Sequence, residues 1–132
     1  MAEIKCIVVT PEETAFEKDA SYVVIPLYDG EFGIGQNHSP MIGRLGFGEL
    51  RITSGNQEVE RYYVDGGFVQ VADNVVTLLT SRVVPVAEVD EEAAREQLKD
   101  AMNRPAHTPE LLQVRDRNVQ QARAQIRLAA KS

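Results

Sequence analysis

The pattern of apolar residues changes its period near residue 86, and this change limits the possible folds more than any other feature. Before it, short β-branched runs such as "IKCIVVT" and "SYVVIPL" alternate with turn residues about every ten residues. After it, the chain is rich in good helix formers. No long helical pattern interrupts the first part, so parallel βαβ units are not expected. The sequence predicts an α+β protein, with an N-terminal antiparallel β-sandwich or barrel over 1–86 and a C-terminal antiparallel two-helix hairpin over 87–132.

Turn residues divide the first part into strands. The run "GELRITS" alternates, so Leu50 and Ile52 are expected on one face of a strand. Turns are expected at residues 55–57 ("GNQ") and 73–74 ("DN"). The "DGG" at 65–67 is expected to form a tight hairpin turn, because its residues tolerate positive φ. Short strands joined in this way are typical of a sandwich or barrel.

Capping and stop signals mark two helices in the second part. Asp90 is expected to cap a first helix that ends before Pro105, and Thr108 to cap a second that begins at Pro109 and runs to about Ala129. Each helix has a narrow apolar stripe, which predicts an antiparallel hairpin with little apolar surface of its own. We expect it to dock on the sandwich, on another subunit, or on each in turn. The stripes are Ala94, Leu98 and Ala101, and Leu112, Val119, Ala122, Ile126 and Ala129.

The net charge of −6 is unevenly distributed. Residues 1–88 hold 6 basic and 13 acidic residues, whereas 5 basic residues and 1 acidic residue lie from Arg115 to the C-terminus. The acidic body argues against nucleic-acid binding, which depends on a basic face. The basic segment has two explanations that the sequence leaves open. Its cations complement a helix dipole, or they meet an acidic surface on a partner protein.

The chain ends and the cysteine content bear on the compartment. The N-terminus lacks the basic start and apolar stretch of a signal peptide. No apolar run approaches the roughly 18 residues of a membrane helix. The single cysteine, Cys6, permits no internal disulfide and lies in a strand-like run, where it is expected to be a small apolar filler. We therefore expect a cytoplasm-like compartment.

The stretch "YDGEFGIGQNHSPMIGRL", residues 28–45, is rich in glycine but does not assemble a reactive site. Its glycines are followed by "QNHSP" and more strand, whereas a phosphate loop leads into a helix. His38 and Ser39 are adjacent, and adjacent residues rarely present both groups for catalysis. His38 and His107 lack the cysteine or carboxylate partners of a metal site. We expect a shaped loop, with no catalytic residue, metal or cofactor.

The order of several motifs resembles a known family. Along the chain they are "VTP", "VVIP", "GEFGI", "HSP", "GELRI" and "VDGGFVQVADNVVTLLTS". They resemble the N-terminal sandwich of the epsilon subunit of F-type ATP synthases. The chain length and the terminal hairpin are similar as well, so the resemblance spans essentially the whole chain.

The resemblance implies a non-catalytic subunit of the central stalk of a proton-translocating ATP synthase, which couples rotation of the c ring to ATP synthesis. The implied partners are the gamma subunit and the c ring. The implied location is the cytoplasmic face of the bacterial plasma membrane, with attachment only through the complex. Family contacts with the c ring come from the region that matches Glu31, Phe32, Gly33 and His38.

The resemblance also implies a regulatory hairpin. In the family the hairpin folds down on the sandwich, or it extends beside gamma, reaches the alpha and beta subunits and inhibits ATP hydrolysis. The implied contacts with an acidic segment of beta are Arg115, Arg117, Arg123 and Arg127.

Some bacterial epsilon subunits bind ATP through (I/L)-D-x-x-R-A at the start of the first helix and R-x-x-x-R in the second. Asp90, Arg123 and Arg127 match these motifs, but Ala93 stands at the arginine position. Arg95 lies about 200° further round the helix and substitutes poorly. Loss of a strong phosphate partner predicts weak or absent ATP binding. The alternative functions are an ATP-sensing module whose hairpin folds on nucleotide, and a stand-alone hydrolase built around His38.

Overall fold

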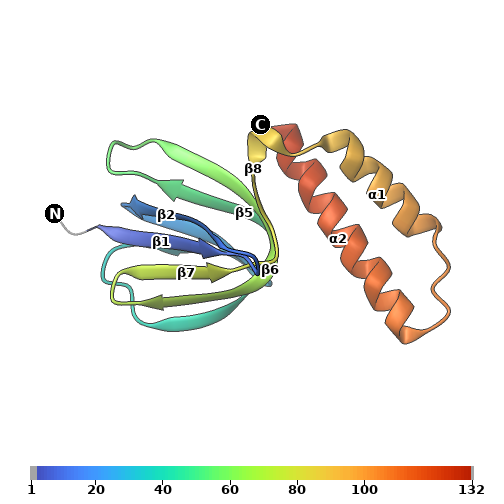
Figure 1. Ribbon diagram of the computed structural model, residues 1–132, viewed down its shortest axis with the longest axis horizontal. Coiled ribbons are helices and arrows are strands. Elements are labelled where there is room, and N and C mark those ends of the chain that lie inside the picture. Colours follow the sequence, from blue (N-terminus) through green and yellow to red (C-terminus); the bar gives the residue numbers. More distant parts are fainter. Residues whose placement is uncertain (1–2, 132) are drawn as a thin grey trace. The chain divides into compact units, whose positions relative to one another are not determined.

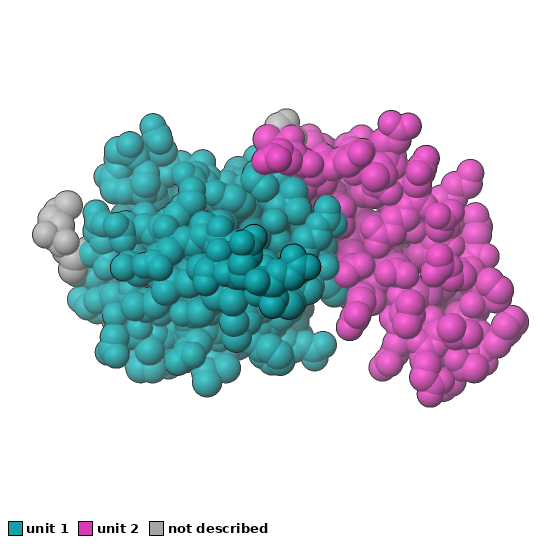
Figure 2. All heavy atoms as spheres, in the orientation of Figure 1, with its two compact units in different colours: residues 1–85 teal, residues 86–132 magenta. Residues whose placement is uncertain are grey.

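The computed structural model describes residues 3–131, which form two compact units that divide between Pro85 and Val86 (Figures 1 and 2). The first unit is built of strands and the second of helices. No described helix is long and apolar enough to cross a membrane.

The described part of the first unit holds an eight-stranded sheet that forms a sandwich. The strand order is β2-β1-β7-β6-β5-β3-β4, and β8 pairs with β6. The strands are β1 (Ile4–Val9), β2 (Thr14–Ala20), β3 (Tyr22–Leu27), β4 (Gly30–Ile34), β5 (Met41–Thr53), β6 (Val59–Ala72), β7 (Val75–Leu79) and β8 (Val83–Pro85). The predicted sandwich is confirmed, and turns occur at 55–57 and 73–74 as predicted.

One strand pair in the described sheet differs from the expected antiparallel pattern. β1 and β7 run parallel, with Cys6 opposite Val76 and Val8 opposite Leu78. The two strands are far apart in sequence, so no hairpin turn fixes their relative direction. Local turn signals therefore could not predict this pair.

The "DGG" segment is not a hairpin turn. Residues 65–67 lie inside β6, where Gly66 and Gly67 have φ of 73° and 111°. A Cβ atom on Gly67 would lie 1.8 Å from the carbonyl oxygen of Leu79. Gly67 therefore permits a close approach between β6 and β7. Glycine inside a strand often marks such a close approach of two backbones.

The shaped loop predicted over residues 28–45 is shorter than expected. Residues 30–34 form β4, and β5 begins at Met41. The irregular part between these strands is residues 35–40, which we call the His38 loop.

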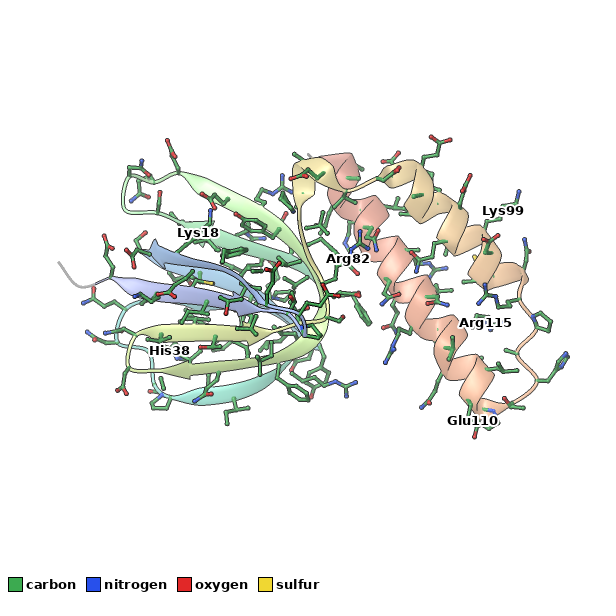
Figure 3. The ribbon with its side chains drawn as sticks, viewed as in Figure 1. Lys18, His38, Arg82, Lys99, Glu110 and Arg115 are labelled. Carbon is green, nitrogen blue, oxygen red and sulfur yellow. The ribbon has the colours of Figure 1, made fainter. Side chains whose placement is uncertain are left out.

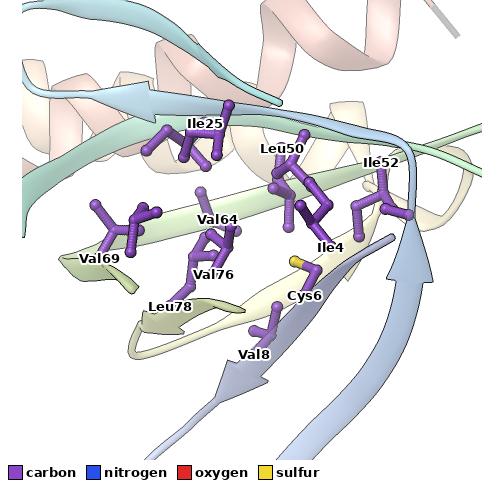
Figure 4. Packing of buried hydrophobic residues seen from close by; sticks show 14 of the residues in the cluster. Ile4, Cys6, Val8, Ile25, Leu50, Ile52, Val64, Val69, Val76 and Leu78 are labelled. Atoms are coloured by element: carbon purple, nitrogen blue, oxygen red, sulfur yellow. The ribbon is translucent and has the colours of Figure 1, made fainter. Parts of the chain in front are cut away.

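Alternate residues of the strands face a single apolar core (Figure 4). Leu50 and Ile52 both lie in it, as the alternation of β5 predicted. Cys6 is fully buried, which confirms its interpretation as a small apolar filler. Burial raises the pKa of its thiol to about 12. The labelled core residues in Figure 4 are Ile4, Cys6, Val8, Ile25, Leu50, Ile52, Val64, Val69, Val76 and Leu78.

The second unit begins with a 3₁₀ turn, η1 (Val86–Glu88), followed by α1 (Glu91–Asn103) and α2 (Pro109–Lys131). Both predicted caps are present. The Asp90 carboxylate accepts a hydrogen bond of 3.0 Å from the Ala93 N–H, and the Thr108 hydroxyl accepts one of 3.1 Å from the Leu111 N–H. The helices form the predicted antiparallel hairpin.

Small residues on both helices are buried in the hairpin unit. Ala94, Ala101 and Ala122 are at most 2% exposed. The predicted stripe of α2 is partly wrong, because Leu112 is 42% exposed. Ala124, Gln125 and Leu128 are buried as well, although at 3.6 residues per turn Ala124 and Leu128 lie far round the helix from Ala122.

Candidate interaction surfaces

Glu31 lies on the outer face of the edge strand β4, where it is already ion-paired. Arg51 of β5 donates from Nη1 to Oε2 of Glu31 at 2.7 Å and from Nη2 to Oε1 at 3.3 Å. This bidentate geometry favours arginine over lysine. The Glu31 side chain is 55% exposed. A partner would therefore meet a carboxylate whose charge is shared with Arg51.

The ion pair of Glu31 belongs to a longer network across three strands. Arg51 also donates to Glu49 at 2.7 Å, and Arg61 of β6 contacts the other oxygen of Glu49 through Nε at 2.7 Å and Nη2 at 2.6 Å. Burial alone would raise the pKa of Glu49, but the two arginines outweigh it and the net pKa is lowered. The hydrogen bonds that Arg51 donates to Glu31 and to Glu49, in that order of effect, raise the pKa of its guanidinium. Glu49 is held in its charged form.

Sequence reasoning did not find Glu49 or Arg61. The alternation in "GELRI" places Glu49 and Arg51 on one face of β5, and this was the available signal. The missing information was the register of β5 against β6, which sets Arg51 opposite Arg61.

The other residues of the predicted c-ring segment divide between two faces of β4. Phe32 packs against the core and meets the ring of His38 edge-on, with 5.4 Å between centroids. Nδ1 of His38 lies 2.8 Å from the Ser39 carbonyl oxygen. Gly33 lies beneath Tyr22, since a Cβ atom there would be 1.9 Å from the Tyr22 hydroxyl oxygen. The structure brings Phe32 and His38 together, and alternation turns Glu31 to the opposite face of the strand.

The outer surface of β5, β6 and β7 carries exposed apolar side chains. Ile42, Phe68 and Leu79 are 79%, 59% and 52% exposed. Phe68 pairs with Leu79 on one side and with Arg44 on the other, and Ile42 lies in the next row, opposite Gln70. We call Ile42, Phe68 and Leu79 the apolar face. Contiguous apolar surface of this kind marks contact sites. Sequence reasoning missed it because the strand neighbours were unknown.

The four predicted arginines of α2 have no hydrogen-bond or ion-pair partner within residues 3–131 (Arg115 is labelled in Figure 3). Arg117, Arg123 and Arg127 are exposed, and Arg115 is half-buried. At 3.6 residues per turn, Arg123 and Arg127 lie about 40° apart, with Arg115 about 80° to one side of this pair and Arg117 about 80° to the other. The four cations therefore spread over an arc of about 200°, centred on Arg123 and Arg127.

The residues that match the ATP motif lie at two places in the hairpin, one at the start of α1 and two on α2. Asp90 is the N-cap of α1, and its carboxylate accepts from the N–H of Ala93, the residue that replaces the motif arginine. Arg123 and Arg127 lie one turn apart on α2. Within the described residues, no group of three His, Cys, Asp or Glu side chains could hold a metal ion.

Comparisons with known proteins agree over nearly the whole chain. Residues 3–86 match the family model of the ATP synthase delta/epsilon chain β-sandwich domain. The ATP synthase epsilon chain of Rhodopirellula baltica is 47% identical over 124 residues, which are 94% of this chain and 96% of that protein. The sodium ion specific epsilon chain of Propionigenium modestum is 30% identical over 98% of this chain and 95% of its own length.

Solved structures show the same fold. A chain in the cryo-EM structure of Euglena gracilis mitochondrial ATP synthase (OSCP/F1/c-ring) matches all of this chain and 83% of its own length, with a TM-score of 0.84 and 21% identity. A chain in the central stalk/c-ring structure of the Tetrahymena thermophila mitochondrial enzyme matches 97% of each chain, with a TM-score of 0.73 and 16% identity. The fold, the motifs and the full-length relatives together show that the chain belongs to the ATP synthase epsilon chain family.

Proposed function

We propose that the chain is a non-catalytic rotor subunit in the central stalk of a proton-translocating ATP synthase. It couples rotation of the c ring to ATP synthesis and inhibits ATP hydrolysis through its hairpin. Two observations carry this proposal: an apolar face on the sandwich, and arginines on the hairpin that have no hydrogen-bond or ion-pair partner among the described residues. The apolar face suits a lasting attachment to a partner. The arginines suit a reversible contact that depends on charge.

The apolar face is the proposed site for the gamma subunit. Burial of Phe68, Leu79 and Ile42 against an apolar partner would remove three large side chains from water. The exposed edge of β4 and the His38 loop form the proposed contact with the c ring, through Glu31, Phe32, Gly33 and His38. The similar chains come from an OSCP/F1/c-ring assembly and from a central stalk/c-ring structure, which supports a place for the sandwich beside a c ring.

The hairpin is the proposed inhibitory element. Its cations Arg115, Arg117, Arg123 and Arg127, which have no ion-pair partner among the described residues, would meet an acidic segment of the beta subunit when the hairpin extends to the alpha and beta subunits. Attachment to these partners places the chain at the cytoplasmic face of the bacterial plasma membrane, as a peripheral part of the complex.

The test is a paired substitution in the full-length chain, reassembled with the remaining subunits. Arg123→Gln with Arg127→Gln should raise steady-state ATP hydrolysis several-fold, because the acidic partner loses two cations. The matched control is Lys99→Gln with Arg104→Gln, which removes two exposed cations from α1 and its C-cap. Equal hydrolysis rates for the two variants would contradict an inhibitory role for the α2 arginines.

A further inference from the structure

The His38 loop is fastened to a distant turn of the sandwich. The N–H of Asn37 donates a hydrogen bond of 2.6 Å to Oδ1 of Asn74, and Nδ2 of Asn74 donates one of 3.4 Å to Oδ1 of Asn37. Asn74 lies in the turn between β6 and β7. The two side chains therefore join segments that are 37 residues apart in sequence. We call this pair the asparagine clamp.

The backbone conformation at both positions of the clamp favours asparagine. Asn37 and Asn74 have φ of 61° and 62°, in the left-handed region. Among residues with side chains, asparagine is one of the few that adopt this region readily. Asn74 is itself anchored, because its carbonyl oxygen accepts a hydrogen bond of 2.8 Å from the N–H of Lys5 on β1. Asn74 is thus hydrogen-bonded to a strand of the sheet.

A second contact holds the loop from the other side. The His38 ring packs edge-on against Phe32 of β4, and His38 directly follows the clamped Asn37. The imidazole is therefore set between a hydrogen-bonded backbone and an aromatic ring. A side chain that is fixed before binding loses less conformational entropy when a partner arrives.

We propose that Asn74 is a positioning residue for the His38 loop, which it holds in the shape that meets the partner. The β6–β7 turn then belongs to the same interaction surface as His38. The clamp rests only on the hydrogen bonds and φ values of this chain. The identity of the partner as the c ring rests on the proposed function.

The first experiment measures the clamp in the free, full-length chain. Asn74→Gly removes both side-chain hydrogen bonds and leaves the positive φ easy to adopt. Exchange of the Asn37 amide hydrogen, followed by NMR, should accelerate about tenfold, the factor expected for one lost hydrogen bond. Asn74→Asp keeps the accepting oxygen and should retain most of the protection. Asp73→Gly changes the neighbouring exposed residue of the same turn, which has φ of 52°, and should leave the exchange unchanged.

The second experiment measures binding of the same variants to ATP synthase depleted of this subunit, with His38→Ala as the reference. Asn74→Gly and His38→Ala should both weaken binding several-fold, and Asp73→Gly should not. Unchanged exchange in Asn74→Gly would overturn the clamp, whatever the proposed function. Faster exchange with unchanged binding would overturn the positioning role if His38→Ala weakens binding. If neither variant weakens binding, the contact role of His38 fails, and the partner-directed part of the proposal fails with it.

Discussion

Gly67 is the residue whose replacement should harm the sandwich most directly. Its φ of 111° is strained for any other residue, and a Cβ atom would lie 1.8 Å from a backbone oxygen of β7. We expect Gly67→Ala to lower the free energy of unfolding by at least about 2 kcal/mol. Chemical denaturation followed by circular dichroism measures this change.

The control for this substitution is Gly55→Ala in an exposed turn. A Cβ atom there would meet only Oε1 of Glu3, at 3.5 Å, so the change should stay within about 0.5 kcal/mol. Comparable losses in both variants would show that the close approach at Gly67 is not what requires glycine.

Single residues differ in how far the sequence alone predicts them. Asp90 and Thr108 were predicted correctly as caps, because capping depends on the next three residues of the chain. The partnership of Glu49 with Arg61, by contrast, depends on strand register. The roles of Glu31 and His38 depend on partners outside the chain, so they stay predictions.

At the scale of elements, the N-terminus of α1 decides the prediction on ATP. The Asp90 carboxylate is engaged in capping, and the exposed Ala93 supplies no cation where the family motif has arginine. Isothermal titration calorimetry of the full-length chain with millimolar ATP should therefore show no saturable binding. Ala93→Arg should gain affinity, and Ala93→Gln, which adds length without charge, should not. A micromolar dissociation constant for the parent chain would refute this prediction and favour the ATP-sensing alternative.

The helices were easier to predict than the strands, for a physical reason. Helix ends are set by local caps and stops, so α1 and the start of α2 agree with the sequence. β4 and the middle of β6 were misread, because glycine serves both chain reversals and close approaches of strands. The parallel pairing of β1 with β7 is non-local and leaves no signal in either strand.

At the scale of the whole molecule, each unit carries its own candidate contact surface. The sandwich has the apolar face, and Glu31 and Glu49 in its charged network are already paired with arginines. The hairpin has arginines without a partner in the described residues. Apolar contacts persist in salt, whereas exposed charge pairs are screened, so the two attachments should separate in their salt response.

We therefore expect added salt to relieve inhibition before it releases the subunit. Between 0.1 M and 0.5 M salt the screening length falls from about 10 Å to about 4 Å, which weakens the contact of the α2 arginines with an acidic surface. ATP hydrolysis by the assembled enzyme should rise over this range while the chain stays bound, as measured by its recovery with the complex. The Arg123→Gln, Arg127→Gln variant should start from a higher rate and show a shallower rise, because fewer charges remain to be screened. A rise of equal steepness in parent and variant, or one that coincides with loss of the chain, would mean that these arginines do not hold the inhibitory contact.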